Sequence, residues 1–373
     1  MTTRREFLAG GAAAAGLAGL LSGPAFAQAL PPKSPMGIGS ASLNGYNAVV
    51  GSKNGNSLIA MIDYVRSLGG GGLQATASGD LAAVRKRLEE LGMFFEGNAR
   101  LPATLSEDTA AFEKSLLDTK AVGGTICRAV SRAPQGASGR RYEFFKSYAE
   151  FKAWEEQANA IVLKCLPIAE RIGVKLALEN HKDRQSADHA AFLKKTSSEY
   201  LGSLIDPGNN ISLLETPEET VNNLLPYALA TSLKDMGVAP YQDGFLLSEV
   251  VFGTGATDQA ALFRLMRKQN PKINMVEELI TRDPLKIPCL TDAYWAGFPA
   301  KDQQRQDAIL AWVKAKETKL PYVDQLTPAE RFKVEESNHR KTIDWGRTFR
   351  MAEASSPERY RFPADIIQGR RGA

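Results

Sequence analysis

The chain has 373 residues, which is enough for one large α/β barrel or two ordinary domains. Its 43% hydrophobic and 24% charged residues are typical of a soluble globular protein. The formal net charge of +4 is small and no dense Lys/Arg face is evident, so the composition excludes a typical nucleic-acid-binding protein.

The first residues have the pattern of an export signal. Arg4 and Arg5 precede an apolar stretch at 8–21, and Ala25-Phe26-Ala27 offers a small-x-small cleavage site. This pattern resembles a twin-arginine signal peptide, so residues 1–27 are expected to engage the Tat export machinery and to direct the protein to the periplasm or outside the cell. The alternative is an N-terminal membrane anchor. It is disfavoured because the stretch is short and rich in Gly and Ala, so no stable membrane insertion is expected.

Apolar runs of strand length recur along the rest of the chain, and amphipathic segments lie between them. The runs expected to form strands are 36–43, 72–76, 93–98, 123–128, 175–179, 200–206, 228–235 and 272–278. The segments expected to form helices are 57–68, 81–91, 106–119, 147–172, 188–195, a helix opened by Pro217, and 258–267. Eight strands that alternate with helices over about 250 residues predict an α/β protein of the (β/α)8 TIM-barrel type.

A doubly wound open sheet is the main alternative fold. It would normally place a glycine-rich phosphate loop after the first strand. Gly37 and Gly39 lie there, but Ser42 leaves the GxGxxG pattern incomplete. The barrel is therefore preferred, with residues 28–288 as the barrel and 289–373 as a C-terminal helical extension.

The extension is expected to contain helices at 303–316 and 328–336, which pack onto the barrel through the aromatic segment 294–298. The extension could cover its own barrel or that of a second copy, so a homo-oligomer is one expectation. Inside the long helix at 147–172, Pro167 is expected to cause a kink or a break.

Three of the expected strands end in acidic residues. Glu179, Asp206 and one of Glu277 and Glu278 follow apolar runs, and the ends of parallel barrel strands meet at one mouth. Converging carboxylates repel each other unless a cation neutralises them. An oxygen-rich site suits Mn²⁺ or Mg²⁺, and added imidazole would favour Mn, Zn or Co. Adjacent strand residues face opposite ways, so only one of Glu277 and Glu278 can enter the mouth.

Short motifs follow one another at the ends of the later strands. They are Leu178-Glu179-Asn180-His181, Leu204-Ile205-Asp206-Pro207-Gly208-Asn209, Ser232-Leu233-Lys234-Asp235, Phe252-Gly253-Thr254-Gly255 with Asp258, and Val276-Glu277-Glu278. In order and spacing they resemble the xylose isomerase-like TIM barrels, the sugar phosphate isomerase/epimerase family. The resemblance implies that Glu179, Asp206 and Glu278 hold one divalent metal. It also implies that Glu179 and Glu278 act as acid and base on the carbon next to a sugar carbonyl.

The sequence departs from that family at one expected ligand. Ser232 stands where the seventh strand of the family carries a His, which puts metal binding in doubt. The chain has only three histidines, and His181 is the one placed to serve as a ligand or substrate donor. His189 is expected to be structural and His339, in the extension, to be exposed.

The remaining candidates also lie at strand ends. Lys234 is expected to contact a substrate oxygen or to form a salt bridge. Glu96 and Asn98 are candidates for sugar hydroxyls, and Arg128 for an anionic group. Asn209 and Asn210 are expected only to form a turn.

Together the residues and the resemblance predict an exported isomerase or epimerase that takes a proton next to the carbonyl of an unphosphorylated sugar or keto-sugar, with metal assistance. A lyase acting on keto-glycosides would share the first step. A non-catalytic periplasmic sugar-binding barrel that has lost its metal is a further alternative, favoured by Ser232. The same family includes endonucleases that act on abasic DNA, but three histidines and the modest charge argue against that activity.

Overall fold

The computed structural model describes residues 30–134 and 140–355. The expected export signal at 1–27 lies outside these residues, as does the end of the chain. Within the described residues, no helix is both long and apolar enough to cross a membrane.

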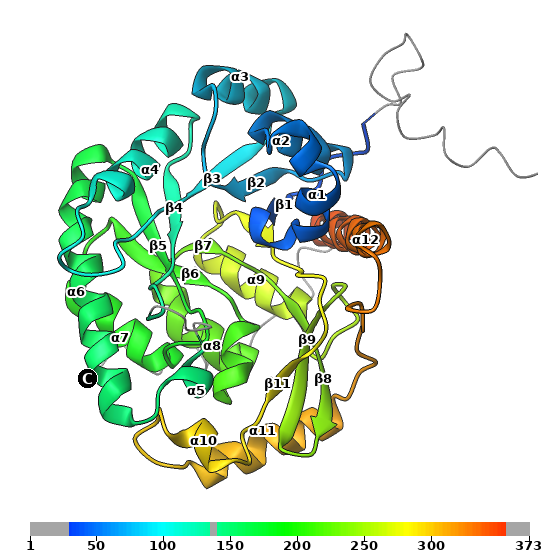
Figure 1. The fold of residues 1–373 in the computed structure, drawn as a ribbon. Helices are drawn as coiled ribbons and strands as arrows, with labels where there is room; N and C mark the ends of the chain where they lie inside the picture. The colour runs from blue at the N-terminus through cyan, green and yellow to red at the C-terminus, as the bar shows by residue number, and fades with distance from the viewer. Residues whose placement is uncertain (1–29, 135–139, 356–373) are drawn as a thin grey trace, which may run out of the picture.

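Eight parallel strands form the central barrel, as the sequence predicted. They are β1 (Met36–Gly39), β2 (Gly72–Ala75), β3 (Phe94–Asn98), β4 (Ile126–Ala129), β5 (Lys175–Glu179), β6 (Leu201–Ile205), β7 (Ala228–Thr231) and β10 (Met275–Glu277). The sheet runs β10-β1-β2-β3-β4-β5-β6-β7, and an isolated parallel bridge between Leu233 and Glu277 joins its two ends. The strands are short (Figure 1). Most of their residues are buried, which explains their continuous apolar runs.

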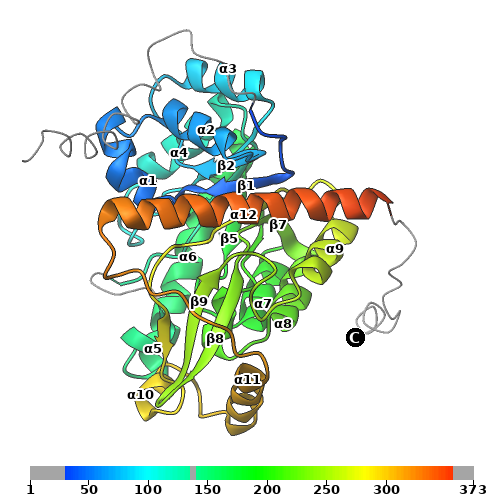
Figure 2. The ribbon, with the colours of Figure 1, turned by 90° about the vertical axis from the view of Figure 1, so that its right-hand side faces the viewer.

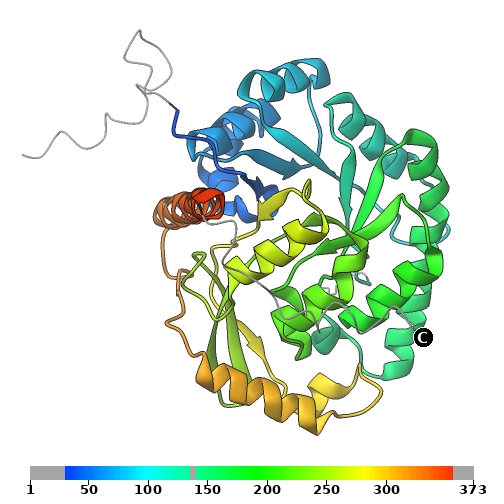
Figure 3. The same ribbon diagram turned by 180° about the vertical axis from the view of Figure 1, so that it is seen from behind.

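A ring of helices surrounds the strands (Figures 1 and 3). The helices that follow the first seven strands are α1 (Asn44–Val49) with α2 (Leu58–Ser67), α3 (Leu81–Leu91), α4 (Ala110–Ala121), α5 (Arg141–Phe144) with α6 (Tyr148–Ile172), α7 (Ser186–Thr196), α8 (Pro217–Leu224) and α9 (Gln259–Gln269). Local signals start several of them. The Asp80 side chain accepts hydrogen bonds from the backbone of Ala82 and Ala83, and Thr216 caps α8 ahead of Pro217. The helix α6 is continuous across Pro167, so the predicted break does not occur.

The region after the eighth strand completes this ring. It contains β11 (Leu285–Ile287), α10 (Asp292–Trp295), α11 (Gln303–Ala315) and the long helix α12 (Pro328–Ser355). Figure 2 shows α12 crossing the side of the barrel beside β1 and α1, which it contacts. A (β/α)8 barrel requires an eighth helix that packs beside the first strand. The helix α12 lies in that position, so it serves as the eighth helix of the ring.

The helix α12 is longer than the predicted segment 328–336, and it buries His339. The prediction that His339 is exposed was wrong. Its ring packs against the barrel, where Nδ1 contacts Glu277 and Nε2 lies 3.3 Å from the backbone oxygen of Ser42. The buried face of α12 could not be recognised from its sequence, because two of the residues on that face, Glu335 and His339, are polar.

A small antiparallel sheet interrupts the barrel pattern after β7. The expected strand 228–235 ends at Thr231, and β8 (Asp235–Tyr241) then pairs with β9 (Gly244–Val250), which pairs with β11. Gly244 begins β9 with a φ of 153°, and a Cβ there would lie 2.1 Å from the backbone oxygen of Ile287. The hairpin leaves the barrel below β7 in Figure 1 and packs against α11.

Candidate active site

Three carboxylates from separate strands meet at one end of the barrel. Glu179 ends β5, Asp206 follows β6 and Glu278 follows β10. All three are buried, and one oxygen of each lies within 4.8 Å of the others. This end of the barrel is the carboxyl end of the strands, where active sites of such barrels lie. The three carboxylates taken alone could hold a metal ion.

Lys234 lies among these carboxylates. It sits between β7 and β8, and its Nζ is 2.7 Å from Asp206 Oδ2 and 2.8 Å from Glu278 Oε2. A third contact, a hydrogen bond of 3.1 Å, goes to Asn209 Oδ1. Three oxygens thus lie within 3.1 Å of the ammonium nitrogen, and the side chain is only 1% exposed.

Arg128 provides the partner of Glu179. Its Nε donates a hydrogen bond to Glu179 Oε2, and its NH2 group lies 3.8 Å from Glu278 Oε1. Arg128 is on β4, next to β5 in the sheet, so strand order places it beside Glu179. Its side chain is 15% exposed, which makes it one of the few parts of this cluster that reach the surface.

Asn209 connects the groups of the site, a role that sequence analysis missed. Its Oδ1 accepts hydrogen bonds from Lys182 Nζ and Lys234 Nζ, and its Nδ2 donates to Glu179 Oε1 at 3.0 Å. The turn that holds it is fixed by Asp206, whose Oδ1 accepts from the backbone N–H of Gly208 and of Asn209. The Asp-Pro-Gly-Asn sequence therefore does predict a turn, but not that its amide would point into the site.

Lys182 is the second residue that sequence analysis did not single out. It is buried and has a φ of 64°, a left-handed conformation that a lysine rarely adopts. The hydrogen bond from Lys182 Nζ to Asn209 and another from the backbone of Arg141 to the Lys182 carbonyl oxygen hold it there. Backbone strain of this kind costs of order 1–3 kcal/mol and persists only where surrounding contacts over-determine it.

The inserted hairpin adds a carboxylate to the site, and the loop between β10 and β11 supplies its basic partner. Glu249 on β9 is buried, and Arg282 donates hydrogen bonds to both of its oxygens. The charge on Glu249 acts on both Lys182 and Lys234. The cluster therefore contains four carboxylates, Glu179, Asp206, Glu249 and Glu278, and four basic side chains, Arg128, Lys182, Lys234 and Arg282. With all eight groups ionised its formal charge is balanced by protein groups, and burial together with the charge of Lys234 lowers the pKa of Lys182 to about 7.

The charges shift several pKa values in opposite directions. Burial alone would lower the pKa of Lys234, but Asp206 and Glu278 raise it well above its usual range. Burial would raise the pKa of Glu278, but Lys234 and Arg128 hold it well below its usual range. Burial raises the pKa of Asp206 to about 6, against the opposing effect of Lys234. Lys234 is thus a permanent cation beside an ionised Glu278.

The site as a whole does not fit a bound divalent ion, although the carboxylates are spaced for one. The Lys234 ammonium contacts the same oxygens that would bind the ion. Ser232, in place of a ligating imidazole, is buried and its Oγ has no hydrogen-bond partner in the described structure. A metal would have to expel Lys234 and would lack this ligand.

Among the predicted substrate-binding residues, His181 and Asn98 offer free polar atoms. His181 is half-buried, and its ring makes no hydrogen bond to the described residues. Burial lowers the pKa of His181 to about 4, although Glu179 opposes this, so the ring is neutral near pH 7. Asn98 is paired in register with Arg128, and its Oδ1 has no partner within the described residues.

Glu96 is placed differently from the prediction. It lies inside β3 rather than at its end, and it is 1% exposed. Its two oxygens accept hydrogen bonds from Gln74 at 2.9 Å and from Asn274 at 3.0 Å. These bonds hold Glu96 in the barrel interior, away from the strand end where it was expected to bind a sugar hydroxyl.

The eighth strand places its two glutamates on opposite sides. Glu278 enters the cluster beside Lys234, whereas Glu277 points outward to His339 on α12. The residues are adjacent, so the alternation of strand side chains explains this division. The second oxygen of Glu277 accepts a hydrogen bond from the backbone of Leu279 at 2.8 Å and so supports the turn that follows Glu278.

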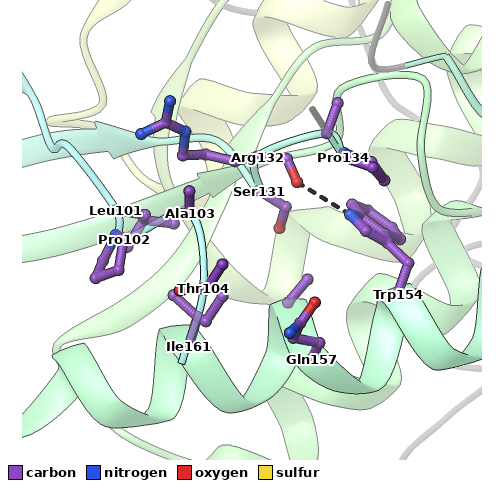
Figure 4. A pocket seen from close by; sticks show the side chains of 12 residues that line it. Leu101, Pro102, Ala103, Thr104, Ser131, Arg132, Pro134, Trp154, Gln157 and Ile161 are labelled. Carbon is purple, nitrogen blue, oxygen red and sulfur yellow. Dashed lines mark hydrogen bonds between the residues drawn. The ribbon is translucent and has the colours of Figure 1, made fainter. Parts of the chain in front are cut away.

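A cavity of about 410 Å³ opens in the loops after β3 and β4 (Figure 4). Leu101, Pro102, Ala103 and Thr104 form one wall, and Trp154, Gln157 and Ile161 on α6 form another. Trp154 Nε1 donates a hydrogen bond to the backbone oxygen of Arg132, drawn as the dashed line. Another wall residue, Ser131, follows Arg128 by three positions, so the cavity adjoins the β4 end of the site.

Comparisons with known proteins agree with this architecture. No protein-family model matches the chain. D-psicose 3-epimerase, solved in the presence of D-fructose, superposes with a TM-score of 0.52 at 14% identity over 84% of this chain and 98% of that one. The IolI protein, solved with a zinc atom, superposes with a TM-score of 0.51 at 12% identity over 83% and 98%. The chain has the (β/α)8 TIM-barrel fold of these proteins.

The resemblance noted in the sequence is therefore confirmed at the level of the fold. In sequence, the chain is 30% identical over 132 residues to 3-oxo-isoapionate decarboxylase of Pectobacterium atrosepticum. This match covers 35% of the present chain and 48% of the decarboxylase, so the chain spans about half the length of the curated relative that it matches. At identities this low the solved structures establish the fold alone, and the reaction has to be argued from the side chains.

Proposed function

We propose that the chain is an enzyme that acts on a sugar or keto-sugar derivative and removes a proton from the carbon next to its carbonyl group. The observation that carries this proposal is the buried cluster in which Glu179 and Glu278 converge with Lys234 at the carboxyl end of the barrel. Two carboxylates beside a fixed cation are the groups that such a reaction needs. D-psicose 3-epimerase, which shares the fold, is named for a reaction on a sugar.

In this mechanism an ionised glutamate takes the proton and becomes a carboxylic acid. The proton that returns to the substrate comes from that acid, or from the other glutamate if it enters the step protonated. General acid–base catalysis of this kind contributes about 10²–10⁴-fold to the rate. Return of the proton to the opposite face gives an epimer, and return to the neighbouring carbon gives an isomer. Hydrogen bonds from Asn209 and Arg128 fix the Glu179 carboxylate, which keeps it in one orientation for the transfer.

The substrate reaches the cluster from the side where Arg128 and His181 are partly exposed. Arg128 can bind a carboxylate or hydroxyl group, and the neutral His181 ring and the Asn98 carbonyl oxygen can bind further hydroxyls. The metal-assisted version of the reaction, with Mn, Mg, Zn or Co, would require an ion that displaces Lys234. The acidic triad and the zinc atom in the IolI structure favour that version, and the occupied position of Lys234 opposes it.

Decarboxylation is a second candidate, favoured by the curated relative. Loss of CO₂ from a 3-keto acid leaves the same enediolate-type intermediate as removal of a proton, so the same cluster would stabilise it. The leaving carboxylate would be bound by a fixed cation, for which Arg128 is placed at the entrance. A lyase acting on keto-glycosides belongs to the same group, because its first step is also the removal of a proton next to a carbonyl.

Exchange of a substrate C–H proton with deuterated solvent tests the proposal. Purified protein is incubated with a panel of aldoses, ketoses, 3-keto-glycosides and 3-keto sugar acids, and deuterium uptake and CO₂ release are followed by NMR. We expect exchange with at least one substrate, at least about 100-fold slower in Glu179→Gln. Glu199→Gln, an exposed carboxylate outside the site, serves as the matched control and should be unchanged.

Binding of a sugar without exchange or CO₂ release in that panel would instead support the non-catalytic sugar-binding barrel. An exchange rate equal in Glu179→Gln and in the parent protein would contradict the assigned role of the cluster. Measurement of binding by calorimetry on the same samples separates these two outcomes.

Export remains part of the proposal and rests on the N-terminal sequence alone. We propose that residues 1–27 carry the protein through the twin-arginine pathway. Replacement of Arg4 and Arg5 by Lys should retain the protein in the cytoplasmic fraction, whereas the parent protein should appear in the periplasm. Equal fractionation of the two proteins would count against this route.

A further inference from the structure

We propose that the ammonium group of Lys234 is the resident cation of this site and takes the place of a divalent metal ion. The catalytic part of this inference rests on the proposed function. The part that concerns metal binding depends only on the geometry of the cluster and can be tested without a substrate.

The coordination of Lys234 resembles that of a bound ion. Its Nζ lies 2.7 Å from Asp206 and 2.8 Å from Glu278, two of the three carboxylates whose spacing would suit a metal. The third acid, Glu179, is paired with Arg128. Asp206 and Glu278 therefore share Lys234, and Arg128 pairs with Glu179, so every carboxylate of the triad has a cationic partner from the chain.

The loss of a ligand agrees with this arrangement. Ser232 is two residues before Lys234 and is fully buried, yet its hydroxyl has no partner within the described structure. A hydroxyl with a short side chain is a poor replacement for an imidazole as a metal ligand. The position that lacks the imidazole and the lysine that contacts the carboxylates thus lie on one strand connection.

The charge balance leads to the same conclusion. Four carboxylates face four basic side chains, so a divalent ion added to the intact cluster would give it a formal charge of +2 in a buried environment. Isolated buried charge is strongly unfavourable. The ion could bind only if Lys234 moved away from Asp206 and Glu278, whose oxygens its Nζ contacts at 2.7 and 2.8 Å.

One contact of Lys234 can be exchanged for a substrate oxygen. Its hydrogen bond to Asn209 Oδ1, at 3.1 Å, is the longest of the three contacts, and Lys182 also donates to that oxygen. Asn209 therefore keeps a donor when Lys234 turns one N–H group toward a substrate carbonyl. The contacts to Asp206 and Glu278 would keep the ammonium in position during this change.

The reaction step is then balanced without a metal. The substrate C–H bond breaks, its proton passes to a carboxylate, and its electron pair forms the carbon–carbon double bond of the enediolate. The carbonyl oxygen takes the displaced pair and becomes an oxyanion, which the Lys234 ammonium stabilises by a charge-assisted hydrogen bond. The ammonium keeps its own protons, and no oxidant or reductant is required.

Metal content is the first test. Purified protein is dialysed against EDTA, then against buffer with Zn²⁺ or Mn²⁺, and analysed for bound metal and by calorimetry. We expect far less than one tightly bound ion per chain and no loss of C–H exchange after EDTA. One ion per chain, with activity lost on chelation and restored by the metal, would overturn the proposal.

A pair of substitutions provides the second test. The double variant Ser232→His with Lys234→Ala supplies the missing ligand and vacates the position of the ammonium, so it should bind one Zn²⁺ or Mn²⁺ per chain where the parent protein binds none. Lys314→Ala, an exposed lysine on α11, is the control and should bind none. Equal metal affinity in the parent and the double variant would contradict the inference. If the double variant does not fold, the metal content of the parent protein decides.

Chemical rescue separates a catalytic cation from a structural one. Lys234→Ala should lose C–H exchange, and added methylammonium should restore part of it, whereas tetramethylammonium, which has no N–H group, should not. Circular dichroism monitors folding in each sample. A folded Lys234→Ala protein that keeps full exchange activity would exclude Lys234 as the cation. If no substrate is found, the metal measurements above still decide the binding part of the inference.

Discussion

His339 Nδ1 lies 2.5 Å from Glu277 Oε1, and this buried contact joins the long helix α12 to the last barrel strand. Glu277 is the neighbour of Glu278, which enters the site from the opposite face of the chain. The contact therefore lies next to Glu278, one of the proposed catalytic carboxylates, on the side of the chain that faces away from the site. It shows how a helix that is far from the barrel motifs in sequence supports the site.

Replacement of His339 by Ala should destabilise the fold. It would leave the Glu277 carboxylate buried without this hydrogen bond, and a buried acceptor left unsatisfied costs about 1–3 kcal/mol. The free energy of unfolding in urea measures this loss. His339→Asn is the matched control, because its amide N–H can replace the Nδ1 donor, and it should lose clearly less. Equal stability of His339→Ala and the parent protein would show that the contact contributes nothing.

Glu96, buried inside the barrel, should make the stability of the folded protein depend on pH. Burial raises the pKa of Glu96 from 4.5 to about 7, against its hydrogen bonds from Asn274 and Gln74. Between these values the folded state binds more protons than the unfolded state, so stability is fully present below pH 4.5 and falls as the pH rises toward 7. The loss amounts to about 3 kcal/mol at most.

Glu96→Gln should not share this fall, because its amide does not titrate. The stability of the variant relative to the parent protein should therefore increase as the pH rises from 4.5 to 7. Urea unfolding at several pH values measures the difference, and the comparison at each pH cancels the contribution of His339. A difference that is constant with pH would show that Glu96 titrates normally in the folded protein.

The alternation of strands and helices was predictable because buried parallel strands have a distinct composition. The run 175–179 coincides with β5, and the strand ends at Glu179, Asp206 and Glu278 do converge. The hairpin β8–β9 was missed, although the Gln242-Asp243-Gly244 turn between two apolar runs is a recognisable hairpin signal. It was missed because a single barrel strand was expected to run to residue 235, which is where β8 begins.

The partners of the carboxylates were less predictable than the carboxylates themselves. Asn209 was expected to be a turn residue, because local sequence describes the backbone of residues 206–209 but not the direction of an amide side chain. Lys182 was overlooked because its position depends on a left-handed backbone held by contacts from Arg141 and Asn209. Whether a cluster of acids holds a metal or a lysine depends on such long-range contacts, which have no local pattern.

Asn209 should contribute to both stability and turnover. In Asn209→Ala, Lys182 loses its acceptor and Glu179 loses a donor, and each buried group left unsatisfied costs about 1–3 kcal/mol. We expect a lower free energy of unfolding and a reduction in kcat that exceeds any change in KM, because the groups that lose their positions are catalytic. Asn209→Asp is the informative comparison.

The aspartate in that comparison would still accept from both lysines but would repel Glu179. It should therefore restore more stability than activity. If Asn209→Ala and Asn209→Asp have the kcat of the parent protein, Asn209 does not position the site.

The contact between α12 and the first strand depends on a glycine. A Cβ added at Gly346 would lie 2.1 Å from Met36 Sδ and 2.6 Å from Met36 Cγ, and Met36 is fully buried. In a free helix the change from Gly to Ala stabilises by about 1 kcal/mol. Overpacking in a closely packed core costs typically 1–3 kcal/mol, so the clash should outweigh the gain in helix propensity.

Gly346→Ala should therefore lower the free energy of unfolding, as measured in urea. Met36→Ala alone should also destabilise, because it creates a cavity at the start of β1. The double variant is the control, since the smaller side chain at position 36 makes room for the added methyl group. It should be more stable than the sum of the single effects predicts, with a coupling of about 0.5–3 kcal/mol. Strictly additive effects would mean that α12 does not approach β1 through Gly346.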